Sequence, residues 1–203
     1  MAPRRGPWLE SGATGLVTRS FSDGGRICYA KVAAGGLVTG LVTVVWQPWI
    51  DQLRALPGDL RVGLAAIPFA ILMALIVRRH ARRSWRPALM AAAVTVVAFV
   101  CSVRTTMWID HEMNGDDTAA RMILAGLGGG FVGAAVLALG FAAMRDSRRG
   151  VAAWLPMLGI GTLAGALLAC DDAIDLVFGL TLYPVWQAGV AVGLVMALRQ
   201  PQA

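Results

Sequence analysis

Charge is scarce in this 203-residue chain: 15% of the residues are charged, whereas 57% are hydrophobic. Soluble domains carry about 25% charged and about 45–50% apolar residues, so the composition excludes an ordinary water-soluble globule. It also excludes intrinsic disorder, because disordered chains combine low hydrophobicity with high net charge. The class that remains is a protein that crosses a membrane several times.

Residue types that often carry chemistry are rare as well. The chain has two histidines, three cysteines and a single lysine, Lys31. It has no metalloprotease helix, no nucleophile elbow and no phosphate-binding loop. Its long apolar runs lack the Asp, Glu, His and Lys residues that proton-coupled pumps keep within the membrane. We therefore expect a protein that is not an enzyme and that has no cofactor or bound metal.

Six long runs without any charged residue make up most of the chain. An α-helix rises about 1.5 Å per residue, so about 20 residues cross a hydrocarbon core of about 30 Å. Because lipid offers no partners to backbone amides, such runs are expected to be helices. The six predicted transmembrane helices cover residues 32–50, 62–77, 87–103, 122–144, 150–170 and 176–198. The second and third runs are short, and a re-entrant pair is the alternative for them.

Basic residues are distributed unevenly among the connections. The N-terminal segment, the loops after the second and fourth runs, and the C-terminus hold 14 of the 18. Basic residues favour the cytoplasmic side, so both termini are expected there. The excess of arginine over lysine favours a bacterial source, and thus the inner membrane. We predict a cytoplasmic arm over residues 1–31, a six-helix domain over residues 32–198 and a cytoplasmic tail over residues 199–203.

A net charge of +6 often indicates a nucleic-acid partner. Here the basic residues flank apolar runs, as membrane orientation requires, so nucleic acid is not expected to bind. The expected partners are the lipid bilayer and either other membrane subunits or further copies of the chain.

Small residues recur at four-residue spacing in most of the runs. Such a stripe flattens one face of a helix and lets two backbones approach closely. The stripes are Gly36 and Gly40; Ala66, Ala70 and Ala74; Gly126 and Gly130; Gly129 and Gly133; Gly161 and Gly165; and Gly189 and Gly193. They predict an all-α bundle that is compact or oligomeric. Ile-Asp pairs at positions 50–51, 109–110 and 174–175 would also fit three αα-hairpins.

The most polar place within a predicted span lies in the last run, at Thr181, Tyr183 and Gln187. Proline lacks an N–H, so Pro184 is expected to kink that helix near mid-membrane, beside Trp186. Two interpretations stay open for Gln187. It either bonds to a neighbouring helix or lines a solute site.

Acidic residues concentrate on the side predicted to face outward. Nine of the twelve lie there: Asp51, Asp59, Asp110, Glu112, Asp116, Asp117, Asp171, Asp172 and Asp175. Arg104 lies among them, slightly inside the boundary, and is expected to form an ion pair with Asp110, Asp171 or Asp172. Possible soft-metal ligands occur at the same depth, at Cys101, Met107, His111, Met113 and Cys170, but their spacing matches no recognised site. A disulfide between the two cysteines is an alternative.

Two functions fit these patterns. The first is a non-catalytic accessory, assembly or scaffolding subunit that docks through an exposed glycine stripe. The alternative is a small transporter or channel for a cation or an apolar solute. In that case Arg104, Thr181, Tyr183 and Gln187 would line an outward vestibule fed by the acidic loops.

Overall fold

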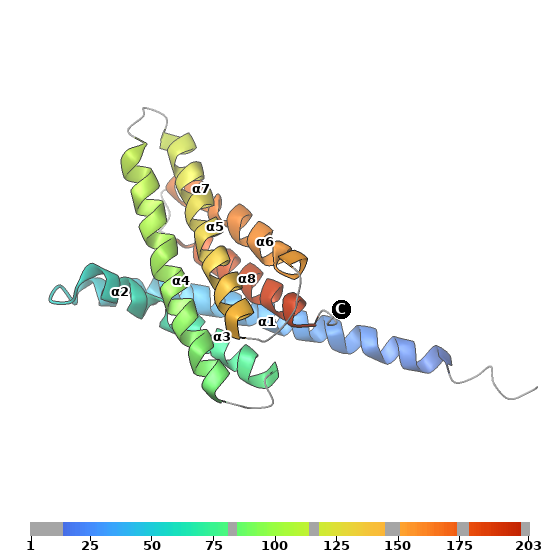
Figure 1. The fold of residues 1–203 in the computed structure, drawn as a ribbon. Helices are drawn as coiled ribbons and strands as arrows, with labels where there is room; N and C mark the ends of the chain where they lie inside the picture. Colours follow the sequence, from blue (N-terminus) through green and yellow to red (C-terminus); the bar gives the residue numbers. More distant parts are fainter. Residues whose placement is uncertain (1–13, 81–84, 114–117, 145–150, 174–178, 200–203) are drawn as a thin grey trace, which may run out of the picture.

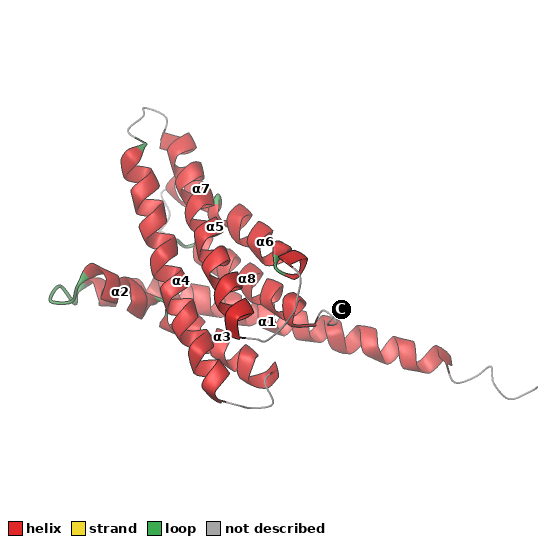
Figure 2. Ribbon diagram, in the orientation of Figure 1, coloured by secondary structure: helices red, strands yellow, loops and turns green. Residues whose placement is uncertain are grey.

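The computed structural model describes residues 14–80, 85–113, 118–144, 151–173 and 179–199, and these form helices joined by short turns, with no strand (Figure 1 and Figure 2). The helices are α1 (Thr14–Asp51), α2 (Gly58–Ala65), α3 (Ile67–His80), α4 (Trp85–Glu112), α5 (Thr118–Met144), α6 (Leu155–Gly165), α7 (Leu167–Ala173) and α8 (Leu182–Arg199), with a 3-10 turn, η1 (Val151–Ala153), before α6. The predicted all-α fold class is confirmed.

Within the described ranges, five stretches of helix are long and apolar enough to cross a membrane. They are Tyr29–Asp51 within α1, α4, α5, the α6–α7 pair over Leu155–Ala173, and α8. The α2–α3 pair is also long and apolar enough when its two helices are taken together, but the two helices are bent by 50° relative to each other. A protein with several transmembrane helices is therefore supported, and the predicted count of six is compatible with the structure.

Helix lengths differ from the charge-free runs at two places. The short third run lies within α4, which has 28 residues because it extends past Arg86 and Arg104 at its two ends. The short second run is broken where α2 ends and α3 begins, at Ala66. Pro68 lies two residues later, and because a proline ring clashes with the carbonyl four residues earlier, it favours a bend at this place.

The last helix begins later than the sequence suggested. α8 starts at Leu182, after a turn in which Gly179 has a φ of 80°, a conformation that favours glycine. Pro184 consequently lies in the first turn of α8, where backbone N–H groups have no intrahelical partner to lose. The kink predicted at Pro184 is therefore wrong, and Trp186 lies near the beginning of α8.

Acidic and basic residues alternate at successive helix ends, which gives the bundle two chemically different ends. The end that we call the acidic end holds Asp51, Asp59, Asp110 and Asp171. The end that we call the basic end holds Arg78, Arg79, Arg86 and Arg199. Exposed tryptophans lie toward both ends, with Trp46, Trp49 and Trp108 near the acidic end and Trp85 at the basic end. This distribution is typical of residues at the two surfaces of a membrane.

Glycines hold α5 directly against α6. A Cβ atom built on Gly126 would lie 2.0 Å from the carbonyl oxygen of Gly165, and one on Gly130 would lie 2.4 Å from that of Gly161. On the neighbouring face of α5, a Cβ on Gly129 would collide with Thr106 of α4. The two glycine stripes of α5 thus contact two different helices, α6 and α4.

The remaining glycine stripes are also buried between helices of this chain. A Cβ on Gly36 or Gly40 of α1 would meet the backbone of α8 at 2.4 Å. A Cβ on Gly193 of α8 would meet Met157 of α6 at 2.8 Å. The predicted close approach of helices is therefore present, and it takes place inside one chain.

Candidate functional site

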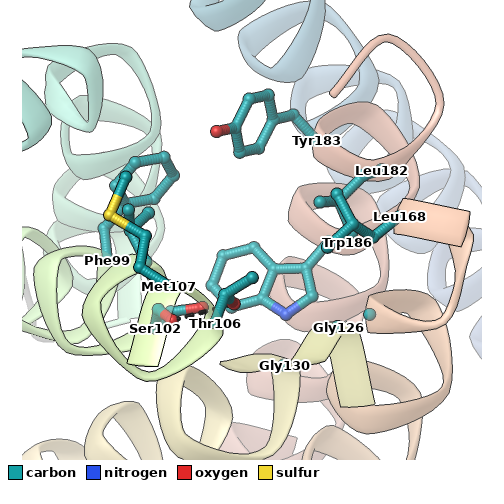
Figure 3. Close-up of a pocket in the computed structure, with 12 residues that line it drawn as sticks. Phe99, Ser102, Thr106, Met107, Gly126, Gly130, Leu168, Leu182, Tyr183 and Trp186 are labelled. Carbon is teal, nitrogen blue, oxygen red and sulfur yellow. Dashed lines mark hydrogen bonds between the residues drawn. The ribbon is translucent and has the colours of Figure 1, made fainter. Parts of the chain in front are cut away.

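A pocket lies near the acidic end, between α4, α5, α7 and α8 (Figure 3). Its volume is about 80 Å³, and none of the residues that line it is charged. They are Phe99, Ser102, Val103, Thr106, Met107, Gly126, Gly130, Gly165, Leu168, Leu182, Tyr183 and Trp186. The glycines that hold α5 against α6 thus also form part of this wall.

Trp186 lies in the middle of the pocket, with Tyr183 above it and the glycines of α5 below it in Figure 3. Its side chain is 5% exposed, and its ring makes an edge contact with Phe69, with 5.7 Å between the centroids. A Cβ on Gly133 would come within 3.0 Å of the indole, so α5 confines the ring as well. Within the described part of the chain, the Nε1 atom of Trp186 has no hydrogen-bond partner.

The hydroxyl groups of Ser102 and Thr106 point to backbone atoms. Ser102 donates to the carbonyl oxygen of Gly129 at 2.8 Å, across the α4–α5 contact. Thr106 donates to the carbonyl oxygen of Ser102 at 3.1 Å, one turn earlier on its own helix. Their oxygens can still accept hydrogen bonds, but their protons are already used.

A second chamber of about 310 Å³ adjoins the first. The two share Phe99, Val103, Met107 and Tyr183, and α1 and α2 add Val44, Gln47, Pro48, Asp51 and Val62 to the second. The rings of Phe99 and Tyr183 lie 5.6 Å apart between the chambers. Met107 is 59% exposed, so both chambers reach the surface beside it.

Asp171 has a structural role that its sequence position did not reveal. Its side chain is 1% exposed. Its carboxylate accepts hydrogen bonds from the backbone N–H of Thr181 at 2.9 Å, the hydroxyl of Thr181 at 2.6 Å and the backbone N–H of Leu182 at 3.2 Å. A carboxylate at this position satisfies the free N–H groups and complements the dipole of α8. Asp171 therefore fixes the start of the helix that carries Tyr183 and Trp186.

The partners predicted for Arg104 are wrong. Arg104 pairs with Asp59 of α2 at 2.5 Å, and both side chains are more than half exposed. Asp110 pairs instead with Arg121 of α5 at 2.9 Å. The carboxylate of Asp171 accepts hydrogen bonds from the residues at the start of α8. The ion pair of Arg104 thus links α4 to α2, because α2 brings Asp59 beside α4 near the acidic end.

Gln187 bonds to a neighbouring helix, as one of the two interpretations predicted. Its Nε2 atom donates to the hydroxyl oxygen of Thr43 on α1 at 3.2 Å, and both side chains are fully buried. Thr43 in turn donates to the carbonyl oxygen of Thr39 at 2.9 Å. Gln187 does not line either chamber, whereas Tyr183 lines both.

The other predicted site residues are not brought together in this way. Glu112 and Asp172 are exposed, and Asp116, Asp117 and Asp175 lie outside the described residues. Cys101 and Cys170 are not joined. Within the described ranges no three His, Cys, Asp or Glu side chains are grouped as metal ligands would be.

In comparisons with known proteins, no family model, curated protein or solved structure matches this chain. Several pocket residues were not singled out from the sequence. Ser102 and Thr106 are spaced by four residues on α4, so they lie on one helix face. This spacing was the feature of the sequence that could have identified them. No such signal marks Phe99, because an aromatic residue in an apolar run is equally expected to face lipid.

Proposed function

We propose that this chain is a non-catalytic protein of a bacterial inner membrane that binds a small, mainly apolar solute and transports it. The observation that carries the proposal is the two-chambered pocket at the acidic end, with the rings of Phe99, Tyr183 and Trp186 in its walls. Ligand sites are typically concave and apolar and contain a few placed polar groups. The two chambers have this character.

The orientation follows from the distribution of basic residues. With both termini in the cytoplasm, the acidic end faces outward and the chambers are entered from that side or from the outer part of the membrane. Met107 marks the place where both chambers reach the surface. Tyr183 would contact a solute in either chamber.

A carrier is favoured over an open channel. A channel needs polar groups along a continuous path, but the large side chains that are fully buried include Met73, Leu137, Met157 and Leu194, which are apolar. Thr95, which could have contributed to such a path, donates to the carbonyl oxygen of Ala91 on its own helix at 2.7 Å. Transport through this bundle would therefore require a change of conformation.

A solute-binding role is also favoured over an accessory role. The accessory hypothesis relied on glycine stripes that dock on another protein. The stripe glycines of α1, α5, α6 and α8 are instead in contact with helices of the same chain, so that docking surface is already covered.

The proposal is tested by purification from native membranes and mass spectrometry of the intact protein. We expect the chain alone or as a homo-oligomer, with a small molecule retained. Val103 lines both chambers, so the larger ring of Val103→Phe should obstruct both and reduce retention. Val97→Phe is the matched control, because Val97 lies on the same helix and is 54% exposed. A second protein in fixed stoichiometry, or equal retention by both variants, would contradict the proposal.

A further inference from the structure

The larger of the two chambers has one wall that is formed by a single face of α1. The residues of this wall are spaced by three and four positions, so their side chains lie on the same side of the helix. They are Val44, Gln47, Pro48 and Asp51. Gln47 donates a hydrogen bond to the carboxylate of Asp51 at 3.2 Å, which holds the carboxylate on this face. Asp51 is exposed, so its carboxylate is open to a ligand in the chamber.

The negative charge of Asp51 has no counter-ion among the described residues, where the ion pairs join Arg104 to Asp59 and Arg121 to Asp110. Asp51 is also the last residue of α1, and the last turn of that helix contains no basic residue. The dipole of a helix is negative at this end and favours a cation. Asp110 lies near the corresponding end of α4, but Arg121 compensates for its charge. A carboxylate that opposes the local rule without a compensating cation is expected at a functional site.

The other walls of the larger chamber are apolar or aromatic. α4 contributes Phe99, Val103 and Met107, α2 contributes Val62, and α8 contributes Tyr183. An aromatic ring attracts a cation through its negative face and also packs against apolar groups. Among the described residues, no basic side chain lines the chamber. Walls of this kind favour a cation with apolar substituents, whereas a ligand with a carboxylate or phosphate would be repelled by the carboxylate on α1.

The volume of the larger chamber suits a small molecule. It is about 310 Å³, about twice that of an engineered cavity of about 150 Å³ that holds one benzene ring. One ring with a substituted ammonium group therefore fits the larger chamber alone, without use of the smaller one. The headgroup of a zwitterionic phospholipid fits less well, because its phosphate would lie beside the same carboxylate.

We infer that the larger chamber binds a small organic cation, with its ammonium group beside Asp51 and its apolar part against Val62, Phe99 and Tyr183. The inference rests on the proposed function and specifies the charge class of the solute. Further exposed carboxylates at the acidic end, at Glu112 and Asp172, would raise the concentration of cations near the chamber.

The test uses the intact protein in a non-ionic detergent and two probes of nearly identical shape. Benzyltrimethylammonium is positively charged, whereas neopentylbenzene has a carbon atom in place of the nitrogen. We expect Asp51→Asn to weaken the binding of benzyltrimethylammonium about fivefold, the effect of two opposite charges about 4 Å apart in water. The binding of neopentylbenzene should not change. Asp51→Glu keeps the charge and should keep most of the affinity. Because each probe is compared with itself across the variants, its partition into detergent cancels.

Asp172→Asn is the matched control, because Asp172 is also an exposed carboxylate at the acidic end but lines neither chamber. It should leave the affinities for both probes unchanged. Val62→Phe tests the place of binding, because Val62 lines the larger chamber and not the smaller one. The added ring should weaken the binding of both probes. Added salt should weaken the binding of benzyltrimethylammonium to the wild type, because salt screens the charge of Asp51. This last measurement remains available if Asp51→Asn does not fold.

Failure of the inference can be distinguished from failure of the proposed function. If both probes bind but neither Asp51→Asn nor salt changes the affinity for benzyltrimethylammonium, the charge class is wrong and the proposed function stands. An uncharged molecule or a phospholipid retained by the protein from native membranes would also overturn the cation class. If both probes bind equally well to the wild type and to Val62→Phe, the larger chamber is not the site. If neither probe binds and the native protein retains no small molecule, the proposed function fails together with the inference.

Discussion

The contact between α5 and α6 and the pocket beside it are built partly from the same residues. Gly126, Gly130 and Gly165 face one another across the contact, where backbone atoms touch. The same three glycines also line the pocket, where they face the rings of α4 and α8. The difference teaches that a glycine stripe closes a helix interface only when the opposite helix also presents small residues. A large, rigid ring opposite the stripe cannot follow the backbone, and a cavity remains.

The largest expected effect comes from adding one methyl group to the α5–α6 contact. Gly165→Ala would place a Cβ 2.0 Å from the carbonyl oxygen of Gly126, so the two helices must separate. We expect a loss of about 3 kcal/mol in the free energy of unfolding, at the upper end of the usual cost of overpacking. Thermal unfolding in detergent measures it.

Gly159→Ala is the matched control for that substitution. Gly159 lies on the same helix, but a Cβ there would meet nothing within 4 Å. Its stability should be unchanged or slightly higher, because alanine loses less backbone entropy than glycine in a helix. Equal stability of the two variants would show that the α5–α6 contact does not hold the bundle together.

The next largest effect is expected at Asp171, which fixes the start of α8 beside the pocket. Asp171→Ala removes the acceptor of three hydrogen bonds and leaves the N–H groups of Thr181 and Leu182 unpaired. We expect a loss of about 2 kcal/mol and faster hydrogen exchange in the first turn of α8, with the exchange of α5 little changed. Asp172→Ala changes an exposed neighbour and should have no effect. Faster exchange throughout α5 and α6 would contradict a local role for Asp171.

The glycine contacts were predictable because their signal is local. Two small residues spaced by four lie on one helix face whatever that face contacts, so Gly126 with Gly130 and Gly161 with Gly165 could be read directly. The partner helix of each stripe could not be read in this way. Whether a stripe is buried within one chain or exposed for another depends on how the helices are arranged, and the expectation of an exposed stripe accordingly loses its support.

The pocket could not be predicted for a related reason. It exists where faces of α4 and α8 meet, between residues about 80 positions apart such as Phe99 and Tyr183. The role of Asp171 was missed because its partners begin ten positions later, beyond a turn. Arg104 was assigned the wrong partner because the break after α2 was not foreseen, and α2 carries Asp59. In each case the missing information was a contact between separate segments of the chain.

A smaller effect is expected at Gln187, where α8 packs against α1 outside the two chambers. Gln187→Met keeps the approximate size of the side chain and removes the hydrogen bond to Thr43. Hydrogen bonds between helices in membranes contribute about 0.6 kcal/mol on average, so we expect a loss of that order. Retention of a small molecule by the purified protein should be unchanged, because Gln187 does not line the chambers. A clear loss of binding would place Gln187 in the solute site instead.

The smallest effect is expected for Arg104→Leu, and it separates two ion pairs that the sequence does not distinguish. Arg104 and Asp59 have side chains that are 63% and 54% exposed, whereas Arg121 and Asp110 are 27% and 40% exposed. Exposed pairs contribute little because water screens both charges and two long side chains must be ordered. We therefore expect Arg104→Leu to leave the melting temperature within the error of the measurement and Arg121→Leu to lower it. If Arg104→Leu were the more damaging change, the attachment of α2 to α4 would depend on that ion pair, and α2 would belong to the stable part of the bundle that the glycine contacts define.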